Sequence, residues 1–150
     1  MTVRGRSRTI TEGDLVSFSA LTGDWHPQHA DAEWAASSRF GERIAHGMLV
    51  LSYAIGLLGF DPERVVALRG IDSLTFKRPV TIGQTIRADA EVAGTTPLDE
   101  THELLTLRLS VLGAEERLVL RANVRVVHRT EGSRSSNGVA EELYAEQVLL

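Results

Sequence analysis

The sequence has 150 residues and no cysteine. This absence excludes disulfide bridges, zinc–thiolate sites, iron–sulfur clusters and thiol nucleophiles. Positive charge is not in excess either, because 16 Lys and Arg residues stand against 20 Asp and Glu residues and the net charge is −4. The overall electrostatics therefore do not favour nucleic acid or an anionic membrane as a partner.

A hydrophobic run long enough to cross a membrane is also missing. The longest stretch without Asp, Glu, Lys or Arg covers residues 44–60, and it contains His46, Ser52 and Tyr53. Because a transmembrane helix needs about 20 predominantly apolar residues, we interpret this stretch as a buried helix. The arginines near the N-terminus precede no apolar run, which argues against a secretory signal, and we expect a cytoplasmic protein.

The motifs of several enzyme classes are absent. The chain has no Gly-x-Ser-x-Gly nucleophile elbow and no P-loop. His102 and Glu103 are followed by Leu-Leu-Thr, so the second histidine of a zinc-protease motif is missing. These absences exclude the corresponding motif-based hydrolase, nucleotide-binding and metalloprotease assignments.

What is present is the composition of one ordinary globular domain. Hydrophobic residues make up 43% and charged residues 24% of the chain. We expect this domain to occupy residues 1–129. A linker-like sequence, TEGSRSSNG, opens residues 130–150, and the last part of this tail is either a short amphipathic helix or no ordered element.

The first half of the chain carries helix signals. Thr11 and Asp14 predict a capped helix start, with Leu15, Phe18 and Leu21 on one face. We expect this helix to end at Gly23 and a rigid loop to follow from Asp24 to His29, around Pro27. Next we expect a short helix from Asp31 to Ser38, which Gly41 ends. A long apolar helix over about residues 46–58 follows. A helix that is apolar on every side must be wrapped by other structure.

The second half carries strand signals. Apolar residues alternate with polar ones over residues 86–92, 105–111 and 118–126, with turn residues at 94–97 and at Gly113. Residues 65–76 form a fourth, less regular strand, and residues 3–10 form an edge strand. One long helix followed by antiparallel strands predicts an α+β fold, in which a curved sheet wraps the helix.

The most promising chemical pair is Asp24 and His29, which lie five residues apart across a proline-stiffened loop. An acid and an imidazole on one rigid segment can face the same small volume, position a water molecule and move its protons. The residues alone leave another interpretation open, in which Asp24 caps the following turn and His29 is an ordinary surface residue.

A further signal is His46-Gly47 at the start of the apolar helix. Free backbone N–H groups at a helix N-terminus, with the helix dipole behind them, suit a polarised carbonyl oxygen. Glycine would let a ligand approach the backbone closely, although it would equally allow close packing.

The loop around Pro27 also has metal-ligand residue types, but we do not predict a metal site. The spacing His26-x-x-His29, with Asp24 and Glu33 nearby, offers nitrogen and oxygen ligands. However, Pro27 breaks the helical spacing that would align the two histidines.

Two stretches of the chain resemble a known family. The sequence LTGDWHPQHADAEWAASSRFGERIAHGMLVLSYAIGLL, residues 21–58, resembles the hydratase motif of the MaoC-like dehydratases, which include the (R)-specific enoyl-CoA hydratases. That motif has Gly-Asp, then usually Asn-Pro-x-His, then His-Gly-Met opening the central helix. The later stretch LTFKRPVTIGQTIRADAEV resembles the strand–Pro-Val–Gly–strand section of the family, and the similarity covers most of residues 10–128.

The resemblance implies a hot dog fold and a homodimer with substrate tunnels at or near the subunit interface. It also implies a hydratase or dehydratase that acts reversibly on 2-enoyl and (R)-3-hydroxyacyl thioesters of coenzyme A or an acyl carrier protein, with no cofactor. Two alternatives stay open. One is a hot dog acyl-thioester thioesterase, and the other is a non-catalytic acyl-binding subunit of a heterodimer.

Carried over residue by residue, Asp24 and His29 match the catalytic pair of the family, and the backbone N–H of Gly47 matches the group that holds the thioester carbonyl. We expect substrate contacts from four further side chains, which are Trp25, His26, His46 and Tyr53. The chain departs from the family pattern at two positions: His26 replaces the usual Asn, and Gln84 replaces the Asp that often follows the strand glycine. The histidine puts substrate choice in question, whereas we interpret Gln84 as a detail of a turn.

Overall fold

The computed structural model of the protein describes residues 2–130, so the predicted tail lies, apart from Thr130, outside the described residues. The elements in chain order are β1 (Thr2–Thr9), α1 (Glu12–Thr22), α2 (Pro27–Ala30), α3 (Ala32–Ala36), α4 (Gly47–Leu57), β2 (Val65–Phe76), β3 (Thr85–Pro97), β4 (His102–Leu112), the short 3₁₀ turn η1 (Ala114–Glu116) and β5 (Leu118–Arg129). No helix within residues 2–130 is both long enough and apolar enough to cross a membrane.

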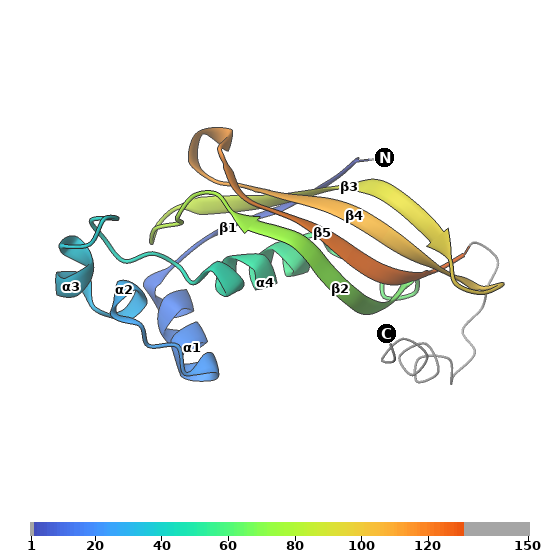
Figure 1. Cartoon of the computed structure of the whole chain (residues 1–150). Coiled ribbons are helices and arrows are strands. Elements are labelled where there is room, and N and C mark those ends of the chain that lie inside the picture. Colours follow the sequence, from blue (N-terminus) through green and yellow to red (C-terminus); the bar gives the residue numbers. More distant parts are fainter. Residues whose placement is uncertain (1, 131–150) are drawn as a thin grey trace.

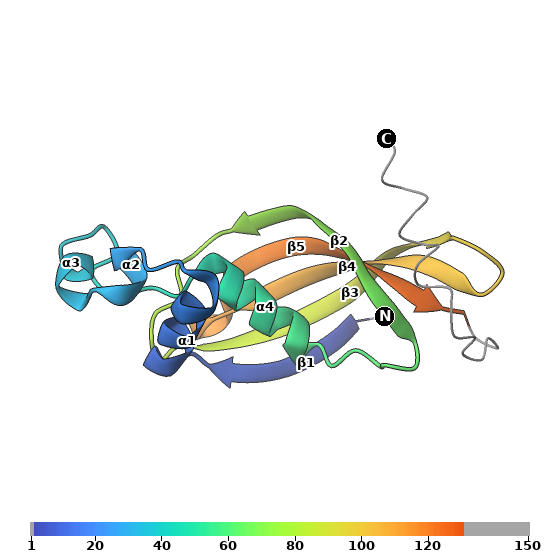
Figure 2. The same ribbon diagram turned by 90° about the horizontal axis from the view of Figure 1, so that it is seen from below.

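One five-stranded sheet in the order β1-β3-β4-β5-β2 carries the fold, and every neighbouring pair is antiparallel. The sheet is strongly curved, and α4 runs across its concave face (Figures 1 and 2). Helices α1, α2 and α3 gather at one end of the sheet, and α2 and α3 project beyond it (Figure 2). This arrangement confirms the predicted α+β hot dog architecture.

Alternation along the strands places the core between the sheet and α4. Ile86 and Ala88 of β3, Leu109 of β4 and Ala122 of β5 are fully buried, and they face a helix whose Leu49, Val50, Leu51 and Ala54 are also buried. Apolar side chains at every second position put one face of each strand out of water, which is the main stabilising contribution to such a sheet.

The wrapping of α4 is less complete than predicted. Met48 is 52% exposed, and Ser52 and Gly56, one and two helical turns further on, are not buried either. These positions share one helix face, which the curved sheet does not reach within the described residues.

Leu21, predicted on the same helix face as Leu15, is 83% exposed in the last turn of α1, just before Gly23 ends the helix in a left-handed conformation. The prediction that Val92 is on the buried face of its strand is wrong: it is 40% exposed, where β3 extends towards the turn of its hairpin with β4.

The turn predicted at residues 94–97 is also wrong, because β3 continues through it and Pro97 pairs with Glu103. A register shift between Val92 and Gly94 marks a bulge, which glycine accommodates, and Pro97 is the last residue of the strand. The chain reverses at residues 98–101, where the Asp99 carboxylate accepts hydrogen bonds from the backbone N–H groups of Thr101 and His102. Gln84, which replaces the Asp that often follows the strand glycine in the family, lies in a turn at residues 81–84 that leads into β3.

Candidate functional site

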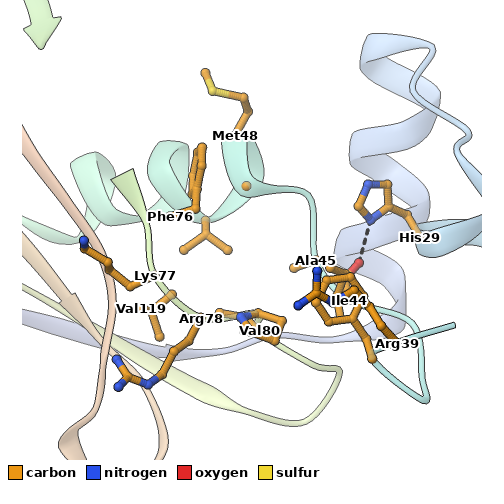
Figure 3. A pocket seen from close by; sticks show the side chains of 14 residues that line it. His29, Arg39, Ile44, Ala45, Met48, Phe76, Lys77, Arg78, Val80 and Val119 are labelled. Atoms are coloured by element: carbon orange, nitrogen blue, oxygen red, sulfur yellow. Dashed lines mark hydrogen bonds between the residues drawn. The ribbon is translucent and has the colours of Figure 1, made fainter. Parts of the chain in front are cut away.

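A cavity of about 510 Å³ opens at the N-terminal end of α4. Its wall is mainly apolar and is formed by α4, the connection from α3 to α4, the end of β2, the connection from β2 to β3, and β5 (Figure 3). Two of the residues singled out from the sequence, His29 and Gly47, line it together. Helix α4 therefore brings its N-terminus to the same space as the imidazole of α2.

The segment that carries His29 is a short helix rather than the predicted loop. Pro27 occupies the first helical position, where its fixed φ suits a helix and its missing N–H is no loss. Nδ1 of His26 accepts a hydrogen bond from the backbone N–H of Gln28 at 3.1 Å and so caps this helix. His26 performs the capping that asparagine side chains commonly perform, which explains how it replaces the usual residue.

A backbone carbonyl fixes the orientation of the His29 ring. Nδ1 of His29 lies 2.7 Å from the carbonyl oxygen of Ile44 (Figure 3). A carbonyl oxygen can only accept, so Nδ1 carries a proton, and in the neutral form of the ring Nε2 has the free lone pair. Gln28 anchors the same two segments, because its side chain donates to Glu42 O and its carbonyl accepts from Ile44 N. His29 is thus positioned as a base.

Asp24 lies beside this base. It directly follows Gly23, whose left-handed conformation ends α1 and turns the chain. Its backbone N–H donates to Thr22 Oγ1 and its Oδ1 accepts from the N–H of His26, which orients the carboxylate. One oxygen of Asp24 and one ring nitrogen each of His29 and His46 lie within 4.8 Å of one another. The structure therefore brings Asp24 and His29 together.

His46 is the third member of this cluster, and it is buried behind His29 with an exposed fraction of 2%. Its ring stacks on that of His29 with 3.9 Å between centroids. Its Nε2 donates to the Asp24 carbonyl oxygen at 3.1 Å and lies 3.0 Å from Ser19 Oγ. Burial lowers its pKa, so the ring stays neutral near pH 7.

Ser19 was not identified from the sequence. It is 27 residues away from His46 and belongs to the buried face of α1, where only the tertiary fold shows the contact. Nδ1 of His46 has no hydrogen-bond partner among the described residues. His46 does not line the cavity; it lies against the His29 ring and the Asp24 backbone carbonyl.

Gly47 begins α4, and no side chain caps this helix within the described residues. The N–H groups of its first turn are therefore available to an acceptor in the cavity, and the helix dipole adds partial positive charge there. A Cβ on Gly47 would lie 2.7 Å from Cε1 of Phe76, so a larger residue would displace that ring. Glycine here thus allows close packing of the Phe76 ring as well as access to the helix N-terminus.

The remaining predicted substrate contacts do not line this cavity. Trp25 is 52% exposed on the surface next to Asp24. The His26 ring packs edge-on against Trp34. Tyr53 lies elsewhere on α4, where its hydroxyl donates to Asp14 and its ring stacks under the Arg8 guanidinium. Of these side chains, His26 and Tyr53 connect neighbouring segments, His26 by capping α2 and Tyr53 by its bond to Asp14 of α1.

The cluster of Asp24, His29 and His46 also has the residue types that hold a metal ion. It differs from the set that the sequence spacing offers, because His46 joins it in place of His26 and Glu33. Each imidazole already has one nitrogen in a hydrogen bond to a backbone carbonyl, so His29 Nε2 and His46 Nδ1 are the atoms left for a ligand.

Comparison with known proteins identifies a matching family model and relatives of similar sequence. The model of the MaoC like domain matches residues 1–112. The Protein MaoC of Klebsiella aerogenes is 45% identical over 83 residues, which cover 53% of this chain and 24% of that protein. An (R)-specific enoyl-CoA hydratase of Rhodospirillum rubrum is 37% identical over 91 residues, which cover 61% of this chain and 63% of that protein. The chain thus matches less than two thirds of the length of these two relatives.

Solved structures share the fold. A monoamine oxidase regulatory protein from Archaeoglobus fulgidus superimposes with a TM-score of 0.82 at 40% identity, covering 87% of this chain and 89% of that chain. A Mycobacterium tuberculosis protein described as a double hot dog fold superimposes with a TM-score of 0.78 at 21% identity, covering 93% of this chain and 44% of that chain. By the family match over residues 1–112, the chain belongs to the MaoC-like domain family, and its structure is the hot dog fold.

Proposed function

We propose that the protein is a hydro-lyase that adds water reversibly to 2-enoyl thioesters and forms (R)-3-hydroxyacyl thioesters. One observation carries this proposal: His29, held as a base by the Ile44 carbonyl, and the uncapped N-terminus of α4 at Gly47 line the same cavity. The names of relatives support the substrate class and the (R) stereochemistry, since one of them is an (R)-specific enoyl-CoA hydratase.

In the hydration direction, the thioester oxygen accepts hydrogen bonds from the first-turn N–H groups of α4, led by that of Gly47. Attack at C3 moves electron density onto this oxygen, and the N–H groups together with the helix dipole stabilise the enolate charge. Nε2 of His29 removes a proton from a water molecule as the hydroxyl group bonds to C3. Transfer of this proton from His29 to C2 restores the base and completes the addition, so one water is consumed for each double bond.

Asp24 orients the attacking water and assists the delivery of the proton to C2. Its carboxylate lies within reach of the water that contacts His29, because the relevant atoms of Asp24 and His29 lie within 4.8 Å. The steps of this mechanism are proton transfers between positioned groups and water, so we propose that it proceeds without a cofactor.

The test measures the absorbance of the conjugated enoyl thioester, with short and medium trans-2-enoyl-CoA substrates. We expect loss of absorbance without release of free thiol. Asp24→Asn and His29→Ala should each lower kcat by about 10²- to 10⁴-fold with the fold retained, because each removes an acid–base group. Glu33→Gln is the matched control, since it neutralises an exposed carboxylate of the neighbouring helix α3.

Three outcomes would contradict the proposal. Release of free thiol would indicate a thioesterase. Near-native turnover in Asp24→Asn would remove the role of Asp24. An inactive isolated chain that becomes active only in a stable heterodimer with a homologue would indicate a non-catalytic subunit.

We also propose that the protein works as a homodimer. Strand β2 is an edge of the sheet within the described residues, with β5 as its one neighbour. Met48 and Phe76, which line the cavity, are 52% and 49% exposed. A second copy packed at this edge would cover apolar surface at the cavity mouth.

A further inference from the structure

Gln28 is a buried amide next to the proposed base. It directly precedes His29 on α2, and its exposed fraction is 7%. Glutamine side chains are mostly exposed in folded proteins, so a buried one indicates a specific contact. The family pattern Asn-Pro-x-His leaves this position open, and a role for Gln28 therefore does not follow from the resemblance.

Two hydrogen bonds from Gln28 hold residues 42–44 against α2. Its side-chain Nε2 donates to Glu42 O at 3.1 Å, and its carbonyl oxygen accepts from the N–H of Ile44 at 3.2 Å. One bond is at each end of this segment. Gln28 thus ties the carbonyl-bearing residue Ile44 to the helix that carries His29.

The same segment is held from two other directions. Arg43 forms an ion pair with Glu12 of α1 at 2.6 Å. The N–H of Ala45 donates at 2.7 Å to the carbonyl oxygen of Val80, which lies in the connection from β2 to β3. These two contacts fix the segment to α1 and to the sheet, so its distance from α2 depends on Gln28.

The tautomer of His29 depends on this distance. Ile44 O lies 2.7 Å from Nδ1 of His29 and can only accept, so it selects the ring with a proton on Nδ1 (Figure 3). The hydrogen bond of one ring nitrogen sets the state of the other. In water, a neutral histidine side chain carries its proton mainly on Nε2, and that tautomer has no lone pair on Nε2. Without Ile44 O, most neutral rings would therefore lack the proposed base.

We propose that Gln28 is a positioning residue that selects the basic tautomer of His29. It acts through the backbone: it holds residues 42–44 on α2, and Ile44 O then keeps the proton on Nδ1. This inference rests on the proposed function, in which Nε2 of His29 removes a proton from water. Gln28 itself does not line the cavity, so it acts without touching the substrate.

The first experiment measures the tautomer. In ¹⁵N NMR of the full chain labelled at histidine, at pH 8, the protonated and unprotonated nitrogens of a neutral ring have different chemical shifts. The His29 signals are those that His29→Ala removes. We expect the Nδ1–H tautomer to predominate in the wild-type protein. In Gln28→Met, which has a side chain of similar length without an N–H donor, the Nε2–H fraction should rise about fivefold, the effect of one lost hydrogen bond.

Asn123→Leu is the matched control, because it removes an amide that donates to Asp72 between β5 and β2. This variant should retain the wild-type tautomer. Gln28→Glu is a second test variant that keeps the shape of the side chain, and its ionised carboxylate cannot donate to Glu42 O. Predominance of the Nε2–H tautomer in the wild-type protein would overturn the proposal without any variant. An unchanged tautomer in a folded Gln28→Met or Gln28→Glu protein would overturn it as well.

The second experiment measures turnover of trans-2-enoyl-CoA per folded protein. In Gln28→Met, we expect kcat to fall about 10- to 100-fold with KM nearly unchanged, because the base is then less often in the correct tautomer and place. A purely structural role would lower stability and leave kcat of the folded protein unchanged, which would contradict the proposal. Absence of turnover in the wild-type protein, with a tautomer that depends on Gln28, would overturn the hydratase and leave the positioning role standing.

Discussion

One ring nitrogen of His26 caps the N-terminus of helix α2. Nδ1 accepts the backbone N–H of Gln28 at 3.1 Å, and three residues later in the sequence His29 lines the cavity. We expect His26→Asn to retain the cap, because an amide oxygen reaches the same donor. His26→Ala should lower the free energy of unfolding by about 1 kcal/mol, the usual cost of losing an N-cap.

Chemical denaturation of the three proteins at pH 8 measures this difference, and kcat on the same samples shows whether the cap also positions His29. We expect kcat of His26→Ala to fall further than that of His26→Asn. Equal stability of the Ala and Asn variants would mean that the ring nitrogen contributes no capping energy, and that the contact with Trp34 explains the histidine instead.

At this scale, the sequence allowed prediction of residues that are close along the chain. Asp24 and His29 share one short segment, so their proximity followed from local geometry. The contacts of His46 with Ser19 and with the His29 ring join α1, α2 and the start of α4, and no spacing in the sequence encodes them. Tyr53 is on the apolar helix as well, but 3.6 residues per turn direct it to Asp14, and it does not line the cavity.

Three elements meet at Asp14. Its carboxylate accepts hydrogen bonds from Arg8 of β1 at 2.7 Å, from Tyr53 of α4 at 2.7 Å and from the backbone N–H of Thr11 at 2.8 Å, while the Asp14 N–H donates to Thr11 Oγ1. This capping box starts α1, and the two side-chain contacts fix α1 against the sheet and the central helix. The orientation of α1 in turn places Ser19 and Asp24.

The same carboxylate gives a pH dependence to stability. Burial works against its charge, but the hydrogen bonds from Tyr53, Thr11 and Arg8 outweigh burial and lower its pKa from 3.8 to about 2. The folded pKa lies below the unfolded one, so the unfolded chain binds more protons between these values. Stability from Asp14 is therefore complete above about pH 4 and is lost as the pH falls towards 2, by about 2 kcal/mol.

Urea denaturation between pH 5 and pH 2 tests this, with Asp14→Asn as the reference. Asp99 and Glu116 also have lowered pKa values, from the Thr101 backbone N–H and from Arg87 respectively, and they contribute to both proteins alike. The difference in unfolding free energy between the two proteins should shrink as the pH falls through this window. A constant difference would show that the Asp14 contacts add no charge-dependent stability.

Whole elements were predicted better than their ends. Period-two alternation located β3, β4 and β5 because one face of each strand is buried, whereas β2 alternates less regularly. The predicted ends were wrong where packing against the core no longer determines the length of a strand. Strand β3 continues through Gly94 to Pro97 because β4 is there to pair with it. Pro27 predicted a rigid loop, yet with a cap before it the same proline starts a helical turn.

At the scale of the whole molecule, the cavity is assembled from segments far apart in the chain. His29 comes from α2, Gly47 from α4, Phe76 to Val80 from the end of β2 onwards, and Val119 from β5. The resemblance to a family implied the catalytic residues and the fold. The cations of the cavity were not identified as a group, because Arg39 follows α3 and Lys77 follows β2, and only the tertiary fold brings them to one cavity.

The same sheet order leads to a prediction about assembly. Within residues 2–130, β1 and β2 are the two edges. Strand β2 has twelve residues, and β5 is its one neighbouring strand in this range, so β2 is a sheet edge at which a second chain could add a strand. Close to this edge, Met48 and Phe76 leave about half of their apolar surface exposed. We therefore expect a homodimer that covers this edge and the cavity mouth.

Light scattering coupled to size-exclusion chromatography should give twice the chain mass of 16.4 kDa at micromolar concentration. Hydrogen exchange gives the position of the contact. If the dimer forms at β2, its amides that do not bond to β5 will exchange slowly, and they will exchange faster as dilution dissociates the dimer, while β4 amides remain protected throughout. Fast exchange of those β2 amides in a protein of twice the chain mass would place the interface elsewhere. A mass of one chain at all concentrations would require the cavity mouth, with Met48 and Phe76, to function open to solvent.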